Sequence, residues 1–305
     1  MSKTILGVDI GNSRLKLALL NKGRVTRLVS ELLPDGIVNG GRIISLDKMS
    51  DFLKETVDKH HIRARRCAVL LPDSRAITHR AVLAAMTEKQ LKLNLPYEFS
   101  DYLTDSRDQY IYDYALIDMR RDNDGKPYEM ELLVTATLKS TIQDYSQMFR
   151  WAGFKLVSAV PPECAYGRLL KRYQVNHPEV KDQICCIVDL GQFSSNIYMF
   201  NKGHFDVARE LEGVGSEQEH IANQTVYDNI VVDIMRAIKF YTYNNGGIPV
   251  ETIWVCGGGS QNAILIDQLQ DDLDLEVRLA SDLLKDVKEE QSLLAACTGA
   301  ISAAQ

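Results

Sequence analysis

The chain begins with short stretches in which apolar and polar residues alternate. Two of these stretches flank Asn21-Lys22-Gly23, a turn signal typical of a tight connection between antiparallel strands. Alternation with a period of two places apolar side chains on one face of a sheet. The pattern therefore predicts a three-stranded meander, with strands over residues 4–8, 14–20 and 24–32.

Helical spacing of apolar residues replaces this alternation over residues 47–60, and an apolar run at 67–71 predicts a buried strand. Residues 74–154 then follow a different pattern, which predicts a compact α+β unit inserted into the first lobe. Its expected elements are strand 77–83, helix 87–102, strand 112–119, strand 128–138 and helix 140–152.

The first pattern resumes after this insertion, with a strand predicted over 154–160 and a helix over 163–173. A second lobe is expected from residue 184, beginning with another meander over 184–209. Its remaining expected elements are helix 226–243, strand 252–256, helix 262–273, strand 276–279 and a final helix 290–303.

Size and charge limit the classes of function. The 305 residues exceed what one hydrophobic core usually supports, so two lobes are expected. The net charge of −6, with scattered Lys and Arg, argues against binding to nucleic acid, and the basic run 63–66 is interpreted as a solvated connection. Without an apolar stretch of membrane-spanning length or a signal peptide, we expect a cytoplasmic protein with no direct membrane insertion. Its six cysteines lack metal-site spacing and are interpreted as reduced core residues.

One motif occurs twice: VDIGNSRLKLALLNKG at 8–23 is echoed by VDLGQFSSNIYMFNKG at 188–203. In each copy an apolar run ends at an Asp, and a Gly two positions later opens a polar turn. Glycine can adopt positive φ and leaves neighbouring N–H groups free to face an anion, while the carboxylate can hold a hydrated Mg²⁺. Two such turns facing each other would grip a polyphosphate from both sides.

A third glycine loop, CGGGS at 256–260, leads from a predicted strand into a predicted helix, whose N-terminus favours anions. Taken singly, each loop is more often a plain turn. The three loops in this order are much harder to obtain by chance.

These loops, with PPECAYG at 161–167 and the closing Thr298-Gly299-Ala300, resemble the actin, Hsp70 and sugar kinase superfamily. Within it, the inserted α+β block resembles subdomain 1C of the division protein FtsA. The stretches LLPDGIVNGGRIISLDK at 32–48 and YEMELLVTATLKSTIQDYSQMFRWAGFKLVSAVPPECA at 128–165 resemble the type IV pilus assembly protein PilM family in particular. The resemblance covers about residues 4–210 and 226–304.

The resemblance implies an α/β, two-lobed actin-like ATPase fold with an inserted FtsA-like 1C subdomain. Residues 1–73 and 154–183 would form the first lobe, 1A, and residues 74–153 the 1C-like insertion. Residues 184–305 would form the second lobe, 2A, with subdomain 2B truncated at about 210–225.

The resemblance also implies roles in binding ATP and Mg²⁺. Asp9 and Gly11 match one phosphate loop, Asp189 and Gly191 match the other, and both aspartates would hold Mg²⁺ through water. Glu163 matches an acid that orients water or Mg²⁺, although a carboxylate at a helix start is an equally good interpretation. The further cofactor-binding candidates are Asn12, Ser13, Lys16, Ser194, Ser195, Gly257, Gly258, Gly259 and Ser260.

Two departures from the family pattern argue for weakened or lost ATP binding. Phe193 lies in the second phosphate loop, so either its ring points into the core or the pocket is compromised. Only about fifteen residues separate Arg209 from the helix at Val226, where PilM and FtsA carry subdomain 2B beside adenine. Hydrogen bonds made in open water contribute little affinity, so an efficient ATPase is not expected.

The resemblance implies a scaffold in the assembly platform of a type IV pilus or related secretion system. In the family, the groove between 1A and 1C takes the cytoplasmic tail peptide of a bitopic membrane protein, PilN. The candidate edges of this groove here are strand 77–83 and helix 87–102, although their apolar residues fit a core better than a groove, because amphipathic faces usually just bury. Contacts with other platform components and recruitment to the inner face of the membrane follow from the same resemblance, and self-association is left open.

Two other functions are weighed against the scaffold. DIGNSRLKLAL at 9–19 resembles the opening of type III pantothenate kinase, which would make the chain a small-molecule kinase. The second phosphate loop, the insertion and the lack of that family's Gly-Ala-Asp-Arg motif argue against it. The other alternative is an FtsA-like polymerising division protein. It would require an amphipathic membrane-targeting helix at the C-terminus, whereas this sequence ends in ISAAQ.

Overall fold

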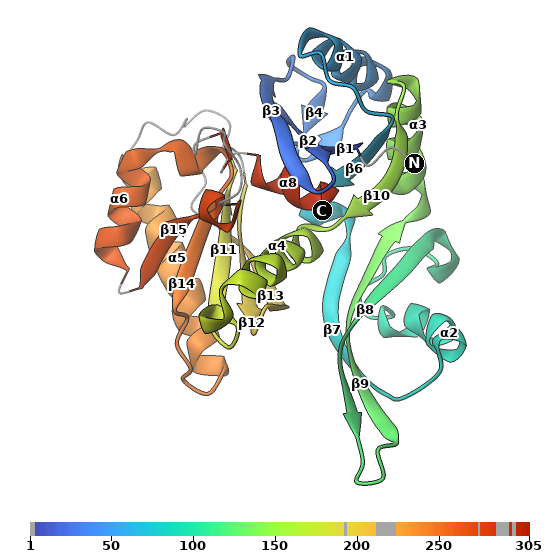
Figure 1. Ribbon diagram of the computed structural model, residues 1–305, viewed down its shortest axis with the longest axis vertical. Helices are drawn as coiled ribbons and strands as arrows, with labels where there is room; N and C mark the ends of the chain where they lie inside the picture. Colours follow the sequence, from blue (N-terminus) through green and yellow to red (C-terminus); the bar gives the residue numbers. More distant parts are fainter. Residues whose placement is uncertain (1–3, 192–193, 212–223, 274, 285–292, 295–296) are drawn as a thin grey trace.

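The computed structural model of the chain describes residues 4–191, 194–211, 224–273, 275–284, 293–294 and 297–305 (Figure 1). Two five-stranded sheets form the centres of two lobes, and a smaller three-stranded sheet extends from the first lobe. No helix in the described part of the chain combines the length and apolarity that crossing a membrane requires.

The first sheet has the strand order β10-β6-β1-β2-β3. Its central strand β1 pairs antiparallel with β2 and parallel with β6, and the tight turn at Lys22-Gly23, with φ of 52° and 77°, reverses the chain directly after β2. Helices α1 and α3 pack on one face and close an apolar core. The elements are β1 (Thr4–Ile10), β2 (Arg14–Asn21), β3 (Arg24–Leu32), α1 (Leu46–Lys59), β6 (Arg66–Leu70), α3 (Lys139–Trp151) and β10 (Lys155–Val160), with a small β4 (Val38–Asn39) and β5 (Arg42–Ile43) hairpin.

The second sheet, β13-β12-β11-β14-β15, repeats this plan, as the duplicated motif suggests. Strand β11 again pairs antiparallel with the next strand and parallel with a later one. In register, Asp9 lies opposite Lys16 and Asp189 lies opposite Asn196. The elements are β11 (Ile184–Leu190), β12 (Ser195–Asn201), β13 (His204–Leu211), α5 (Gln224–Asn244), β14 (Thr252–Cys256), α6 (Ala263–Asp272) and β15 (Glu276–Leu279).

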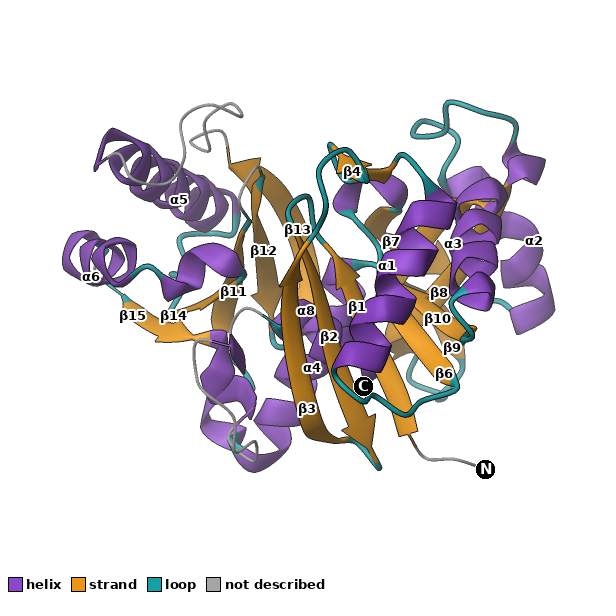
Figure 2. Ribbon diagram, turned by 90° about the horizontal axis from the view of Figure 1, so that it is seen from above, coloured by secondary structure: helices purple, strands orange, loops and turns teal. Residues whose placement is uncertain are grey.

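Two helices, α4 (Pro162–Asn176) and α8 (Thr298–Ala304), lie between the lobes (Figures 1 and 2). Their apolar side chains join residues of both sheets in one buried core, including Leu20 of β2, Tyr198 of β12 and Trp254 of β14. Helix α8 lies against β1 because glycine stands where the two meet: a Cβ on Gly7 would overlap the Ala300 carbonyl. The two lobes therefore share one apolar interface, which is formed around these helices.

The insertion contains a three-stranded antiparallel sheet, β7-β9-β8, with α2 packed on one face. Thr87 starts α2 with a capping box, in which its side chain and that of Gln90 each bond the other's backbone N–H. Strands β8 and β9 project beyond α2 as a long hairpin (Figure 1). The elements are β7 (Ile77–Ala84), α2 (Glu88–Glu98), β8 (Tyr110–Arg121) and β9 (Pro127–Leu138).

The structure differs from the sequence prediction at two helix boundaries. Helix α2 ends at Glu98 and not at 102, because Ser100 and the following residues bond back in turns. The glycine loop after β14 enters a 3₁₀ turn, Gly258–Gln261, before Asn262 caps α6. The final helix is described only from Thr298, since most of residues 285–296 lie outside the described residues. Phe193 and nearly all of the predicted 2B truncation at 210–225 also lie outside the described residues or side chains.

The contact between β1 and α8 predicts that Gly7→Ala is costly. The added methyl group would have to push the Ala300 backbone away, and overpacking of this kind costs about 1–3 kcal/mol. Urea denaturation should show that loss in the free energy of unfolding. Gly258→Ala is the matched control, because its Cβ would meet open space, and a change within about 0.5 kcal/mol is expected there. Equal effects of the two substitutions would contradict the close approach of α8.

Candidate functional site

The ends of β1 and β11 border a cleft of about 740 Å³ between the two lobes. Each strand carries an aspartate near its carboxyl end, and each is followed by the glycine of the duplicated motif, Gly11 or Gly191. The cleft therefore brings together most of the residues predicted from sequence. Those that line it are Asp9, Gly11, Asn12, Ser13, Lys16, Asp189, Gly191, Ser194, Gly258 and Gly259.

The first polar turn is held by its own backbone and by the neighbouring hairpin. The Gly11 N–H donates to the Arg14 carbonyl over 3.0 Å, which closes the turn. The Gly41 N–H donates to Asn12 Oδ1 over 2.7 Å. Asn12 thus ties the turn to the β4–β5 hairpin, and its carbonyl oxygen is already occupied by a backbone donor.

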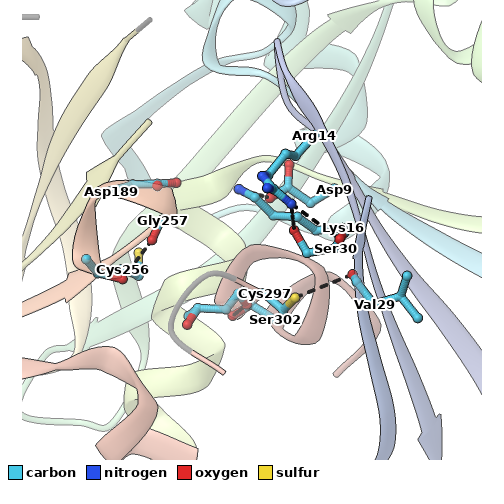
Figure 3. A network of polar contacts seen from close by, with 12 residues as sticks. Asp9, Arg14, Lys16, Val29, Ser30, Asp189, Cys256, Gly257, Cys297 and Ser302 are labelled. Carbon is cyan, nitrogen blue, oxygen red and sulfur yellow. Dashed lines mark hydrogen bonds and ion pairs between the residues drawn. The ribbon is translucent and has the colours of Figure 1, made fainter. Parts of the chain in front are cut away.

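Lys16 lies at the floor of the cleft, between the two aspartates (Figure 3). Its Nζ is 3.1 Å from Asp9 Oδ2, and both side chains are mostly buried, with exposed fractions of 13% and 15%. Burial opposes the charge of Lys16, but the carboxylates of Asp9 and Asp189 outweigh it, and the pKa of Lys16 is raised. Lys16 therefore stays charged and serves carboxylates from both lobes.

Asp189 is oriented from below by a buried tyrosine. Tyr166 of α4 donates its hydroxyl to Asp189 Oδ2 over 2.6 Å. Burial raises the pKa of Asp189, against the opposing effects of Lys16 and Tyr166. Gly257, with φ of 81°, passes so close that a Cβ there would overlap Asp189 Oδ1. Glycine at this position is thus required both by the backbone conformation and by the contact.

Three of the predicted cofactor-binding residues do not line the cleft. Gly257 packs against Asp189, as described. The Ser260 hydroxyl is buried and donates to the Gly257 carbonyl over 2.7 Å, so it stabilises its own loop. Ser195 begins β12 and is 1% exposed, and its Oγ has no hydrogen-bond partner among the described residues.

Glu163 is buried at the start of α4, where Pro162 and not Glu163 borders the cleft. Its Oε2 has no hydrogen-bond partner among the described residues. Burial raises the pKa of Glu163 to about 8, with a further contribution from the charge of Asp73. Near neutral pH this carboxyl is mostly protonated, which differs from the charged helix-start carboxylate that the sequence suggested.

Asp73 is a cleft residue that the sequence interpretation missed. It follows β6, and its carboxylate accepts hydrogen bonds from the Tyr198 hydroxyl over 2.7 Å and from Asn196 Nδ2 over 3.1 Å. Burial raises its pKa to about 6, although the Tyr198 bond opposes this shift. One sequence feature could have indicated this role, since Asp73 comes just after a buried strand. That strand, β6, is parallel to β1, so the carboxyl ends of the two strands meet at the same edge of the sheet. Arg14, Glu210 and Gln261 also line the cleft without having been predicted.

Comparison with known proteins identifies the family. The profile of the family described as type IV pilus assembly protein PilM matches residues 7–228. The chain belongs to this PilM family. No protein with a curated description shows significant sequence similarity to it.

Two solved structures show the fold of this PilM-family chain. A structure of the PilM–PilN type IV pilus biogenesis complex superimposes with a TM-score of 0.77 at 18% identity, covering 98% of this chain and 97% of that one. The ethanolamine utilization protein EutJ from Carboxydothermus hydrogenoformans gives a TM-score of 0.54 at 12% identity, covering 97% and 88%. The two-lobed actin-like fold expected from the sequence is confirmed.

The cleft of this PilM-family chain is lined by residue types that bind phosphate and Mg²⁺ in proteins. The turn at Gly11–Ser13 borders it from the first lobe, Gly191 and Ser194 border it from the second, and Gly258 presents open space beside it. Lys16 supplies a cation, and Asp9 and Asp189 are of the donor type that holds a hydrated Mg²⁺. Among the described residues no three His, Cys, Asp or Glu side chains gather as a ready metal cage. A bound Mg²⁺ would therefore depend on phosphate and water oxygens as well.

The buried carboxyl of Glu163 predicts a loss of stability with rising pH. In the unfolded chain Glu163 ionises near its ordinary pKa of 4.5, whereas in the folded chain it holds its proton until about pH 8. The folded state binds more protons in this interval, so the free energy of unfolding falls as pH rises, by up to about 1.4 kcal/mol per pH unit.

Urea denaturation at about pH 7 and 8 tests this expectation. Glu163→Gln should flatten the slope. Glu179→Gln is the matched control, because Glu179 is 64% exposed and its pKa is lowered, so it does not titrate in this interval. An unchanged slope in Glu163→Gln would show that the carboxyl is ionised in the folded protein.

Proposed function

We propose that this PilM-family chain is a cytoplasmic scaffold in the assembly platform of a type IV pilus or a related secretion system. In this role it binds the cytoplasmic tail of a PilN-like membrane protein, which recruits it to the inner face of the membrane. The observation that carries the proposal is the family match over residues 7–228, which includes the whole insertion. The similar PilM structure is that of a complex with PilN, which supports a partner of the same kind here.

The insertion is the proposed docking element, because it carries large apolar side chains that its own core does not cover. Leu91, Leu95 and Phe99 of the α2 segment are buried, which agrees with a core role. Leu93 and Tyr97 point outward instead, with exposed fractions of 67% and 62%. The Arg107 guanidinium stacks over the Tyr97 ring at 4.5 Å, which holds that ring in place on the surface. Partner contacts of this kind would bury apolar area now open to water.

The charges in the cleft support weakened nucleotide binding. Four carboxylates and only two cationic side chains line it among the described residues, so a triphosphate would meet excess negative charge unless Mg²⁺ accompanied it. Lys16 is already paired with Asp9. Releasing it for a phosphate would leave a mostly buried carboxylate without its cation, which is costly. The carboxylates are Asp9, Asp73, Asp189 and Glu210, and the cations are Arg14 and Lys16.

Calorimetric titration separates the scaffold from the kinase alternative. The chain should bind the N-terminal tail peptide of a PilN-like protein encoded beside it, without added nucleotide. Mg-ATP should bind with a Kd weaker than about 100 μM, which corresponds to less than about 5.5 kcal/mol. Tight Mg-ATP binding with phosphorylation of pantothenate, and no peptide binding, would contradict the proposal.

The docking role of the insertion predicts that Tyr97→Ser weakens peptide binding. Loss of one exposed aromatic anchor at an interface costs about 2 kcal/mol, or roughly 30-fold in Kd. Tyr243→Ser is the matched control, since Tyr243 is 85% exposed but lies on α5 of the second lobe. Anisotropy of a labelled tail peptide measures both variants. If Tyr243→Ser reduced the affinity and Tyr97→Ser did not, the peptide would dock on the second lobe.

A further inference from the structure

Strand β7 of the insertion and the turn before it are both attached to the second lobe. Arg80, on this strand, lies between two carboxylates: its Nη1 donates to Asp206 Oδ1 of β13 over 2.8 Å, and its Nη2 donates to Glu131 of β9. Just before the strand, Asp73 accepts the bonds from Tyr198 and Asn196 of β12. The strand that opens the insertion thus lies beside the outer edge of the second sheet (Figure 1).

The two ion pairs of Arg80, with Glu131 and Asp206, fix the relative positions of the strands that carry them. The three side chains are only 17–28% exposed, so salt screens their attraction less than on an open surface. The other oxygen of Asp206 accepts the Tyr241 hydroxyl of α5 over 2.7 Å, which fixes the carboxylate toward Arg80. A guanidinium holds two terminal donor nitrogens in one rigid plane, whereas lysine has a single donor nitrogen on a flexible stem. One residue therefore joins β7, β9 and β13.

Two chain segments connect the three-stranded sheet of the insertion covalently to the first lobe. The chain enters the three-stranded sheet after Ala76 and leaves it after Leu138, where α3 returns to the core of the first lobe, and the Thr137 hydroxyl donates to the Arg75 carbonyl over 2.6 Å to join the two crossings. Two neighbouring backbone segments can rotate as a hinge. The ion pair to Asp206 restrains this rotation by fixing a point on β7 beyond the hinge, and Leu133 of β9 adds a packing contact with the core between the lobes.

We propose that Arg80 and Asp206 form a latch that sets the orientation of the insertion by the second lobe, so that movements of the cleft and of the insertion are coupled. When the second lobe moves relative to the first, either the insertion moves with it or the latch breaks. The consequence for partner binding rests on the proposed function: a peptide docked on the insertion would stabilise one arrangement of the two lobes. The latch itself does not depend on any ligand.

Pulsed electron paramagnetic resonance on the ligand-free chain tests the latch. Spin labels at Lys89→Cys on α2 and Ile264→Cys on α6 report the position of the insertion relative to the second lobe, since both sites are exposed. The native thiols interfere little: five of the six are buried, and burial raises the pKa of the sixth, Cys164, to about 12.

The unaltered protein should give one narrow distance distribution. Asp206→Asn and Arg80→Met should each broaden it, and the double variant should broaden it no further. Arg120→Met is the matched control, because it removes an Arg–Glu129 pair that lies wholly within the β8–β9 hairpin. Distributions that stay narrow in both latch variants, or that broaden equally in the control, would overturn the proposal.

Hydrogen exchange with the tail peptide tests the coupling separately. Adding the peptide should slow exchange in β12 and β13 of the unaltered protein, and this protection should be lost in Asp206→Asn. Protection that persists in Asp206→Asn would overturn the coupling. A peptide that does not bind the unaltered protein would overturn the proposed function, while the resonance result would still decide the latch.

Discussion

The arrangement of the cleft depends on the interaction of the charged Lys16 side chain with the carboxylates of Asp9 and Asp189. The duplicated motif brings two aspartates, one from each lobe, to the same mostly buried space, where like charges repel strongly. Lys16 pairs with Asp9 directly and acts on Asp189 across the cleft. In the second copy of the motif the corresponding position, opposite Asp189, is Asn196. Lys16 is therefore the cation that interacts with the aspartates of both copies. Asn196 instead donates its side-chain N–H to the carboxylate of Asp73, which belongs to the first lobe.

This asymmetry links the fold to the proposed function. A nucleotide-binding cleft must offer its positive groups to phosphate, whereas here the buried cation already neutralises a carboxylate of its own chain. Meanwhile Asp73 and Arg80, on either side of the entry to the insertion, both contact the second lobe. Asp73, one of the carboxylates that line the cleft, thus also joins the first lobe to the second, while Arg80 holds the insertion to the second lobe. That is a useful property for a scaffold.

Much of this architecture was predictable from the sequence, because it follows from local patterns. The repeat at Asp9 and Asp189 predicted two matching meanders, and the structure shows two sheets of the same connectivity. Alternation and glycine turns located the strands, and the glycine motifs located the loops that border the cleft. Phosphate contacts by these residues stay a prediction, as do the boundaries assigned to the lobes.

The cross-lobe contacts were not predictable in the same way. Asp73 has the sequence context of a turn after Leu-Pro, and nothing in its neighbourhood points to Tyr198. Arg80 and Asp206 lie on strands of different sheets, and no periodicity relates two such positions. The protonation of Glu163 was equally hidden, because it arises from burial by the tertiary fold and not from its place at a helix start.

A crystal structure obtained with excess tail peptide and excess Mg-ATP together tests the central claim most directly. The account predicts peptide bound on the insertion, the Lys16–Asp9 pair intact and no ordered nucleotide. Ordered Mg-ATP, with Lys16 moved from Asp9 onto its phosphates, would contradict it.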